Sequence, residues 1–197
     1  MGGQDNISRA PDPTGVRRPP LAVILVALVM TALGETSGAV MSQLRAPFDR
    51  WARARITANA AAHGLTGAAE YDDEVRGRAV FAAEAGLSFL HTHAEGLGLV
   101  VLFGSTITAT VVHSRRLRAA LHALLAIGGF FPLGYLVYAV AVVERGREPG
   151  VELGERWILT PLGTAAILGL VALAIALGAA HKRATRDPVR PAPTGGE

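Results

Sequence analysis

The chain has 197 residues, of which 50% are hydrophobic and only 18% charged, whereas an average soluble domain carries roughly 25% charged residues. Its net charge is +3, but the cations gather in short clusters rather than along one face, which argues against a nucleic-acid partner. The absence of cysteine excludes disulfides, iron–sulfur clusters and thiolate metal sites. Because the apolar residues form long, nearly uncharged runs, the composition predicts a membrane protein.

Four apolar runs are long enough to cross a hydrocarbon layer of about 30 Å, which takes roughly 20 helical residues. They are residues 20–41, 89–112, 119–143 and 157–180. We therefore expect an all-α, four-transmembrane-helix bundle over residues 20–181, in contact with a lipid bilayer. The first run has a second interpretation, because Arg17 and Arg18 before it and small residues near its end are also typical of a cleaved secretory signal.

The positions of the basic residues predict how these spans are oriented in the membrane. One cluster precedes the first span, one lies between the second and third, and one follows the fourth, so all three fall on the same face of the membrane. Cytoplasmic loops carry the excess of Lys and Arg. The pattern predicts a multi-pass protein of the cell (inner) membrane with both termini in the cytoplasm. The clusters are Arg17 and Arg18; Arg115, Arg116 and Arg118; and Lys182, Arg183, Arg186 and Arg190.

The two ends of the chain, residues 1–19 and 182–197, are rich in Pro, Gly and charge. They contain too little apolar surface to offset the entropy of ordering, so we expect disordered cytoplasmic tails.

The outer loop, residues 43–88, contains its own helical signals. Residues 47–62 read as an amphipathic helix with Phe48, Trp51 and Ile56 on one stripe. Such a helix either lies in the outer membrane interface or packs against the ends of the spans. The acidic residues 72–74 favour the start of a helix that continues into the second span and projects beyond the lipid.

Ionisable residues inside spans are costly to bury in lipid, so each one is a candidate functional residue. Counting about 1.5 Å per residue from the cytoplasmic ends places polar groups of all four spans at one level, in the outer third of the membrane. Gly34 and Gly38 flank one of these groups, Glu35, and would let another helix approach it closely. The tyrosines and threonines of this layer have an alternative role: the tyrosines could anchor the helices at the membrane interface, and the threonines could bond to their own helix backbone. The polar layer comprises Glu35, His93, Glu95, Tyr135, Tyr138, Thr160 and Thr164.

Three potential metal-ligating side chains lie close together in the sequence His91-Thr92-His93-Ala94-Glu95. Helical residues two apart are rotated by about 200°, so the two histidines point to nearly opposite sides and would serve two sites. His91 and Glu95 share a face, where the carboxylate either orients the imidazole or joins it on a metal. With Glu35, this pair predicts a site for iron, copper or zinc, supported by Tyr135, Tyr138 and Thr164. The alternative is that both histidines are buried and bonded to the acids or to backbone.

Residues 89–104 resemble the tenth transmembrane helix of subunit I in the haem–copper oxidase superfamily, especially its cbb3-type and nitric-oxide-reductase branches. There an H-x-H pattern followed by Leu-Gly begins the helix near its outer end. The resemblance implies a haem b site, with His91 as the counterpart of the proximal ligand of the active-site haem and His93 as an axial ligand of the low-spin haem. The chain lacks the family's copper histidines, because its other histidines lie in the outer loop or near cytoplasmic ends of spans. They are His63, His113, His122 and His181. A second haem ligand would therefore come from a twin subunit, another protein or a non-histidine group.

Three main functions remain open from the sequence, and a fourth, carrier or proton-relay action, is favoured only by the helix-interrupting residues Pro132 and Pro161. The first is a small electron-transfer or redox-associated subunit with haem. The second is a membrane protein with a non-haem metal site, and the third is a non-catalytic accessory subunit whose polar layer holds helices together. Each is compatible with a homo-oligomer or a larger membrane complex. The motifs of P-loop, dinucleotide-binding, serine-hydrolase and zinc-protease chemistry are missing from the sequence, so enzymatic activity is left undecided.

Overall fold

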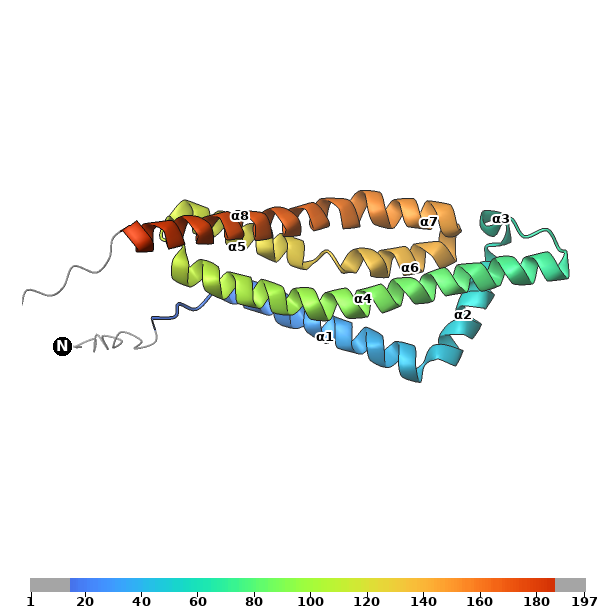
Figure 1. The fold of residues 1–197 in the computed structure, drawn as a ribbon. Helices are drawn as coiled ribbons and strands as arrows, with labels where there is room; N and C mark the ends of the chain where they lie inside the picture. Colours follow the sequence, from blue (N-terminus) through green and yellow to red (C-terminus); the bar gives the residue numbers. More distant parts are fainter. Residues whose placement is uncertain (1–14, 187–197) are drawn as a thin grey trace, which may run out of the picture.

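A computed structural model describes residues 15–186 of the chain. Every regular element in this range is a helix, and four helical stretches are long and apolar enough to cross a membrane: Leu21–Gln43, Ala69–Val111, Arg115–Arg145 and Arg147–Arg183. They lie side by side along one long axis (Figure 1). The predicted all-α four-helix architecture of a membrane protein is confirmed. Of the two predicted tails, residues 1–14 and 187–197 lie outside the described residues.

The first two spans pack closely against each other. Helix α1 (Leu21–Gln43) and helix α4 (Ala69–Val111) meet where small residues face one another, so that a Cβ added at Gly34 would lie 3.0 Å from the Cβ of Ala94. Small residues at such a seam let two backbones approach closely. Helix α4 has 43 residues and is about 65 Å long at 1.5 Å per residue. Its first part therefore extends beyond the other spans, as the sequence predicts (Figure 1).

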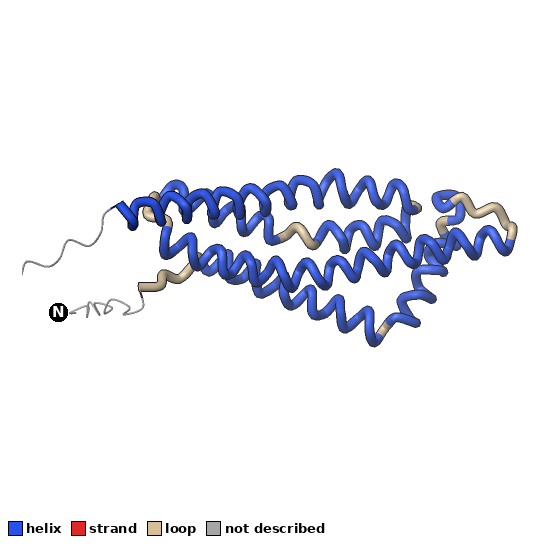
Figure 2. The backbone as a smooth tube through the Cα atoms, viewed as in Figure 1, coloured by secondary structure: helices blue, strands red, loops and turns tan. Residues whose placement is uncertain are grey.

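The third span is broken in the middle. Helix α5 (Arg115–Gly129) and helix α6 (Leu133–Arg145) are separated by Phe130–Pro132, which Figure 2 shows as a loop inside the bundle. Proline has no N–H to donate and clashes with the preceding turn, so it interrupts a helix. The chain uses tighter turns here, with the Phe131 N–H donating to the Gly128 carbonyl at 2.9 Å. The single helix over 119–143 expected from the apolar run is thus two helices.

The fourth span begins earlier and ends later than the predicted 157–180. Helix α7 (Arg147–Gly154), a π-helical turn η1 (Glu155–Leu159) and helix α8 (Thr160–Arg186) follow one another directly. Gly146, at φ +90°, reverses the chain, and Gly150 lets α7 lie against α6, because a Cβ there would be 2.5 Å from the Val142 nitrogen. The connection between the predicted third and fourth spans, residues 144–156, is therefore largely helix. Residues 182–186, expected in the disordered tail, are also helical, since α8 continues past its apolar run.

The segment between the first two spans folds into a cap on the bundle. Helix α2 (Arg45–Ala58) is followed by the short helix α3 (Ala60–His63). Ile56 is fully buried and belongs to the same core cluster as α4 and α6 residues, so of the two alternatives α2 packs against the ends of the spans. Arg55 pairs with Glu144 of α6, with nitrogen–oxygen distances of 2.8 and 2.5 Å. This bond raises the pKa of Arg55 above its ordinary value and keeps the pair charged.

Candidate functional site

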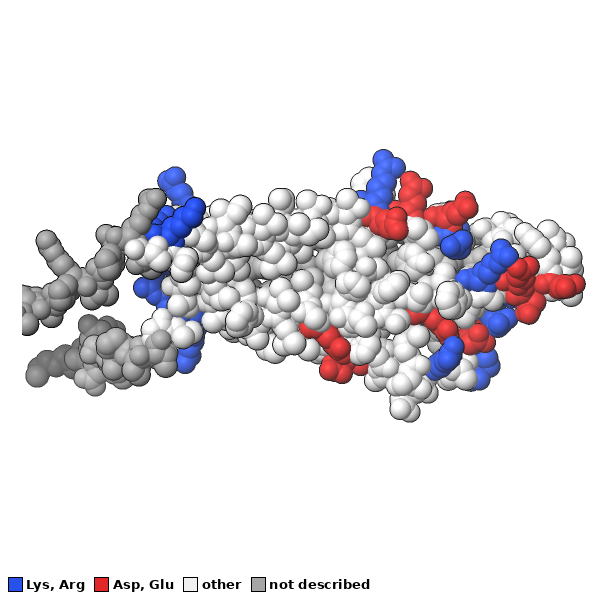
Figure 3. Space-filling model, in the orientation of Figure 1, with Lys and Arg blue, Asp and Glu red and all other residues white. Residues whose placement is uncertain are grey.

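Charge is distributed unevenly along the bundle. Figure 3 shows Lys and Arg without acids at one end, mixed charges at the other, and a nearly uncharged belt with one isolated acidic patch. Glu35 is the only Asp, Glu, Lys or Arg in α1, and Glu95 is the only one between Glu84 and Arg115. The spans at 119–143 and 157–181 contain none. The carboxylates of Glu35 and Glu95 therefore mark the polar site of the belt.

His91 is held at the seam between α1 and α4. Its Nδ1 lies 3.0 Å from the carbonyl oxygen of Gly34 and 2.9 Å from Oε1 of Glu95. Both oxygens are acceptors, so Nδ1 must carry a hydrogen. In the neutral ring, Nε2 then has a free lone pair, and it has no hydrogen-bond partner among residues 15–186. A carboxylate beside one ring nitrogen commonly orients the other nitrogen toward a metal.

Gly38 provides the space for this ring. A Cβ at Gly38 would lie 2.7 Å from Cε1 and 3.0 Å from Nε2 of His91, closer than carbon atoms pack. The Gly34 and Gly38 pair was expected to bring another helix close to Glu35. In the structure Gly34 brings its backbone to α4 and accepts the hydrogen bond, whereas Gly38 accommodates the imidazole. The role of Gly38 was missed because it depends on the register of α1 against α4.

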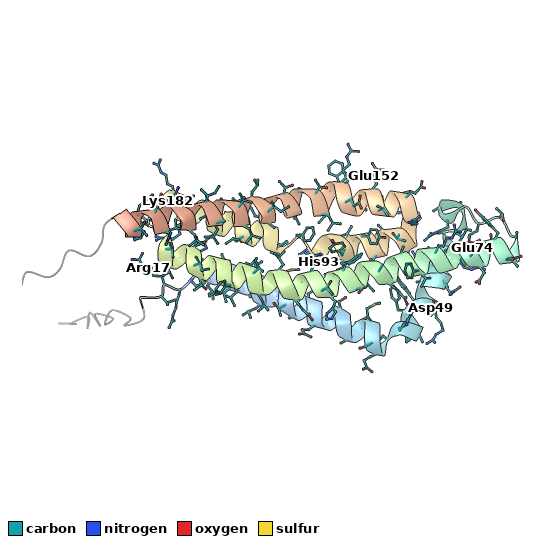
Figure 4. The ribbon with its side chains drawn as sticks, viewed as in Figure 1. Arg17, Asp49, Glu74, His93, Glu152 and Lys182 are labelled. Carbon is teal, nitrogen blue, oxygen red and sulfur yellow. The ribbon has the colours of Figure 1, made fainter. Side chains whose placement is uncertain are left out.

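His93 faces the opposite side of α4. Its Nδ1 donates to the carbonyl oxygen of Phe89 at 2.9 Å, and its ring centroid lies 4.9 Å from that of Tyr135 and 5.8 Å from that of Phe131. Figure 4 shows His93 midway along the bundle, between α4 and the broken third span. The two histidines therefore face different helices, as the helical rotation predicts. Phe131 was not predicted, and the proline after it was the signal that could have drawn attention to it.

The other predicted site residues lie apart from the two histidines. Glu35 is exposed and makes no hydrogen bond or ion pair within residues 15–186. Tyr138 packs between Gly86 of α4 and Gly154 of α7, and Thr164 donates to the carbonyl of Thr160 in its own helix at 2.7 Å. Across the described part of the chain, no three His, Asp or Glu side chains form a group that could hold a metal ion. The structure thus joins His91 with Glu95, and His93 with Tyr135.

The His91 site lies on the surface of the bundle rather than at its centre. The side chains of His91 and Glu95 remain 35% and 33% exposed. A group bound at Nε2 of His91 would therefore be covered from outside, by another protein surface or by lipid. Comparisons with models of protein families, with curated proteins and with solved structures give no match for this chain.

Proposed function

We propose that this chain is a haem-binding subunit of a membrane electron-transfer complex, with His91 as an axial ligand. One observation carries the proposal. Nδ1 of His91 is fixed by the Gly34 carbonyl and the Glu95 carboxylate, and Nε2 has no hydrogen-bond partner within residues 15–186. A neighbouring carboxylate raises the basicity of an imidazole and fixes its tautomer, as is required of a metal ligand.

The number of ligands favours haem b over a bare ion. Zinc, copper and non-haem iron sites take three or four protein ligands, whereas this site offers one free ring nitrogen. Haem iron already has four ligands from the macrocycle and needs only one or two from protein. The likeness of residues 89–104 to the H-x-H helix of haem–copper oxidases supports the same choice. His93, on the other face of α4, is a candidate ligand for a separate haem.

The exposed location indicates where a macrocycle would lie. Because His91 is at the surface seam of α1 and α4, the haem would be enclosed between this chain and a second copy or another subunit. That partner would supply the second axial ligand. We infer that the basic end of the bundle faces the cytoplasm, following the positive-inside rule, which puts the haem nearer the outer surface of the cell membrane.

A second candidate function is that of a non-catalytic accessory subunit. The observation that favours it is Glu35, which is exposed in the apolar belt and has no partner within residues 15–186. A carboxylate facing lipid costs at least about 2.5 kcal/mol near the bilayer centre on insertion scales. A neighbouring subunit that covers α1 and bonds to Glu35 would remove this cost without any cofactor.

Replacing His91 tests the proposal. We expect the full-length protein, expressed with ample haem and purified in detergent, to show a haem Soret band. His91→Ala should abolish that band, because the free Nε2 is lost. The matched control is His181→Ala, since His181 is exposed at the basic end, and it should keep the band. A wild-type protein without haem, or a band that neither His91→Ala nor His93→Ala reduces, would leave the accessory function as the better description.

Glu95 should act as a positioning residue. Glu95→Gln keeps the size of the side chain but removes the charge beside Nδ1 of His91. We expect haem to bind about 10–100-fold more weakly, the usual effect of losing such a partner, and the haem midpoint potential to rise because a less basic imidazole stabilises ferric iron less. Redox titration of the purified variant measures this. An unchanged potential would show that Glu95 has only a packing role.

A further inference from the structure

The basic end of the bundle contains a mostly apolar cavity of about 720 Å³. One wall comes from the turn between α4 and α5, with Val112, and from the first turn of α5, with Leu117; the other comes from α8, with Ile175 and Ala176. His113 and Arg183 also line it and are exposed. Most of the cavity surface is therefore apolar, and one edge of it is cationic.

The cations around this cavity have no acidic partner among residues 15–186. Within residues 15–186, every ion pair between an arginine and a carboxylate lies at the opposite end of the bundle, as in Arg45–Glu84 and Arg156–Glu152. Figure 3 shows the same separation, with Lys and Arg but no Asp or Glu visible at the basic end. The side chains concerned are Arg115, Arg116, Lys182 and Arg183, all exposed. This surface is therefore complementary to an anion.

We propose that this cavity binds one anionic phospholipid, with an acyl chain between α8 and the α4–α5 turn and the phosphate beside His113 and Arg183. A soluble anion would leave the apolar walls without a partner, whereas a phospholipid matches both parts of the site. The start of α5 adds to the attraction, because its first N–H groups carry partial positive charge. Basic pockets between transmembrane helices bind acidic lipid headgroups in this way.

The charge of the headgroup decides the selectivity. A phosphatidylglycerol headgroup has a net negative charge, whereas phosphatidylcholine carries its own ammonium and is neutral. Each Lys or Arg near an anionic lipid surface strengthens binding by roughly fivefold. The proposal therefore requires at least about fivefold preference for the anionic lipid, and a loss of similar size when one cation of the site is removed.

Native mass spectrometry of the detergent-purified full chain tests this site. With phosphatidylglycerol and phosphatidylcholine of equal chain length added together, we expect one tightly held phosphatidylglycerol per chain. Arg183→Gln should weaken its binding roughly fivefold, whereas the control Arg156→Gln, an exposed arginine at the other end, should not. Ala176→Trp should also expel the lipid, because it fills the cavity without changing charge.

Three results would overturn the proposal. The first is equal binding of the two lipids, and the second is an equal effect of Arg183→Gln and Arg156→Gln. The third is displacement of the lipid by millimolar inorganic phosphate, which would identify a simple anion site and not a lipid site. Retention of phosphatidylglycerol in the presence of phosphate, with loss in Ala176→Trp, supports it. The outcome does not depend on haem.

Discussion

Gly128→Val is expected to separate α5 from α8 and to destabilise the bundle severely. A Cβ at Gly128 would lie 2.5 Å from both the nitrogen and the Cα of Ala166. These are backbone atoms of a long helix, so they cannot move aside as a side chain can. Inserting extra carbons into a packed core costs typically about 1–3 kcal/mol, and valine adds three. We expect the melting temperature in detergent to fall by at least about 5 °C, measured by light scattering or by loss of the monodisperse peak.

Gly178→Val is the matched control for this result. Gly178 lies in α8, is exposed, and has nothing within 4 Å of the position where a Cβ would be added. The same side chain should therefore change the melting temperature by no more than about 2 °C. Equal destabilisation by the two variants would mean that α5 and α8 do not meet at Gly128 and that the packing of the third and fourth spans is different.

The apolar runs were sufficient to predict the spans, because length and hydropathy decide which helices can cross a bilayer. They could not predict where the fourth span begins. Residues 144–156 carry both charges and glycines, which is typical of a loop, yet Gly150 and Gly154 let α7 pack against α6. That contact is tertiary, and no local pattern in residues 144–156 encodes it. Pro132 alone did not predict that the third span would break at Phe130–Pro132, since proline can also kink a helix without ending it.

The candidate site was predictable to the extent that it lies on one helix. The rotation of about 100° per residue places His91 and Glu95 on one face of the helix and His93 on another. The structure confirms both positions. The Gly34 carbonyl and the space above Gly38 belong to a second helix. Their positions depend on how far α1 slides along α4, which the sequence of neither helix determines. Glu35 was expected at the site for its depth and for the glycines that flank it, and neither fixes the direction of its side chain.

Gly38→Ala is expected to remove the haem while leaving the bundle folded. The added Cβ would lie 2.7 Å from Cε1 of His91. The obstructing group is a side chain at a partly exposed seam, so the ring can swing outward at little cost to packing. Nδ1 then leaves the Gly34 carbonyl and Glu95, and Nε2 loses its fixed direction. We expect haem affinity to fall about 10–100-fold and the melting temperature of the haem-free protein to change by no more than about 3 °C.

The control for this variant is Gly96→Ala, because Gly96 lies beside Glu95 and has nothing within 4 Å of its Cβ position. It should retain haem and keep or slightly raise stability, since alanine favours a helix over glycine by roughly 1 kcal/mol. The comparison separates two roles of Gly38. If Gly38→Ala lowers the melting temperature and haem content together, Gly38 serves mainly to pack α1 on α4. If haem alone is lost, the glycine is there to hold the imidazole of His91 in place, and the direction of Nε2 is the property on which binding depends.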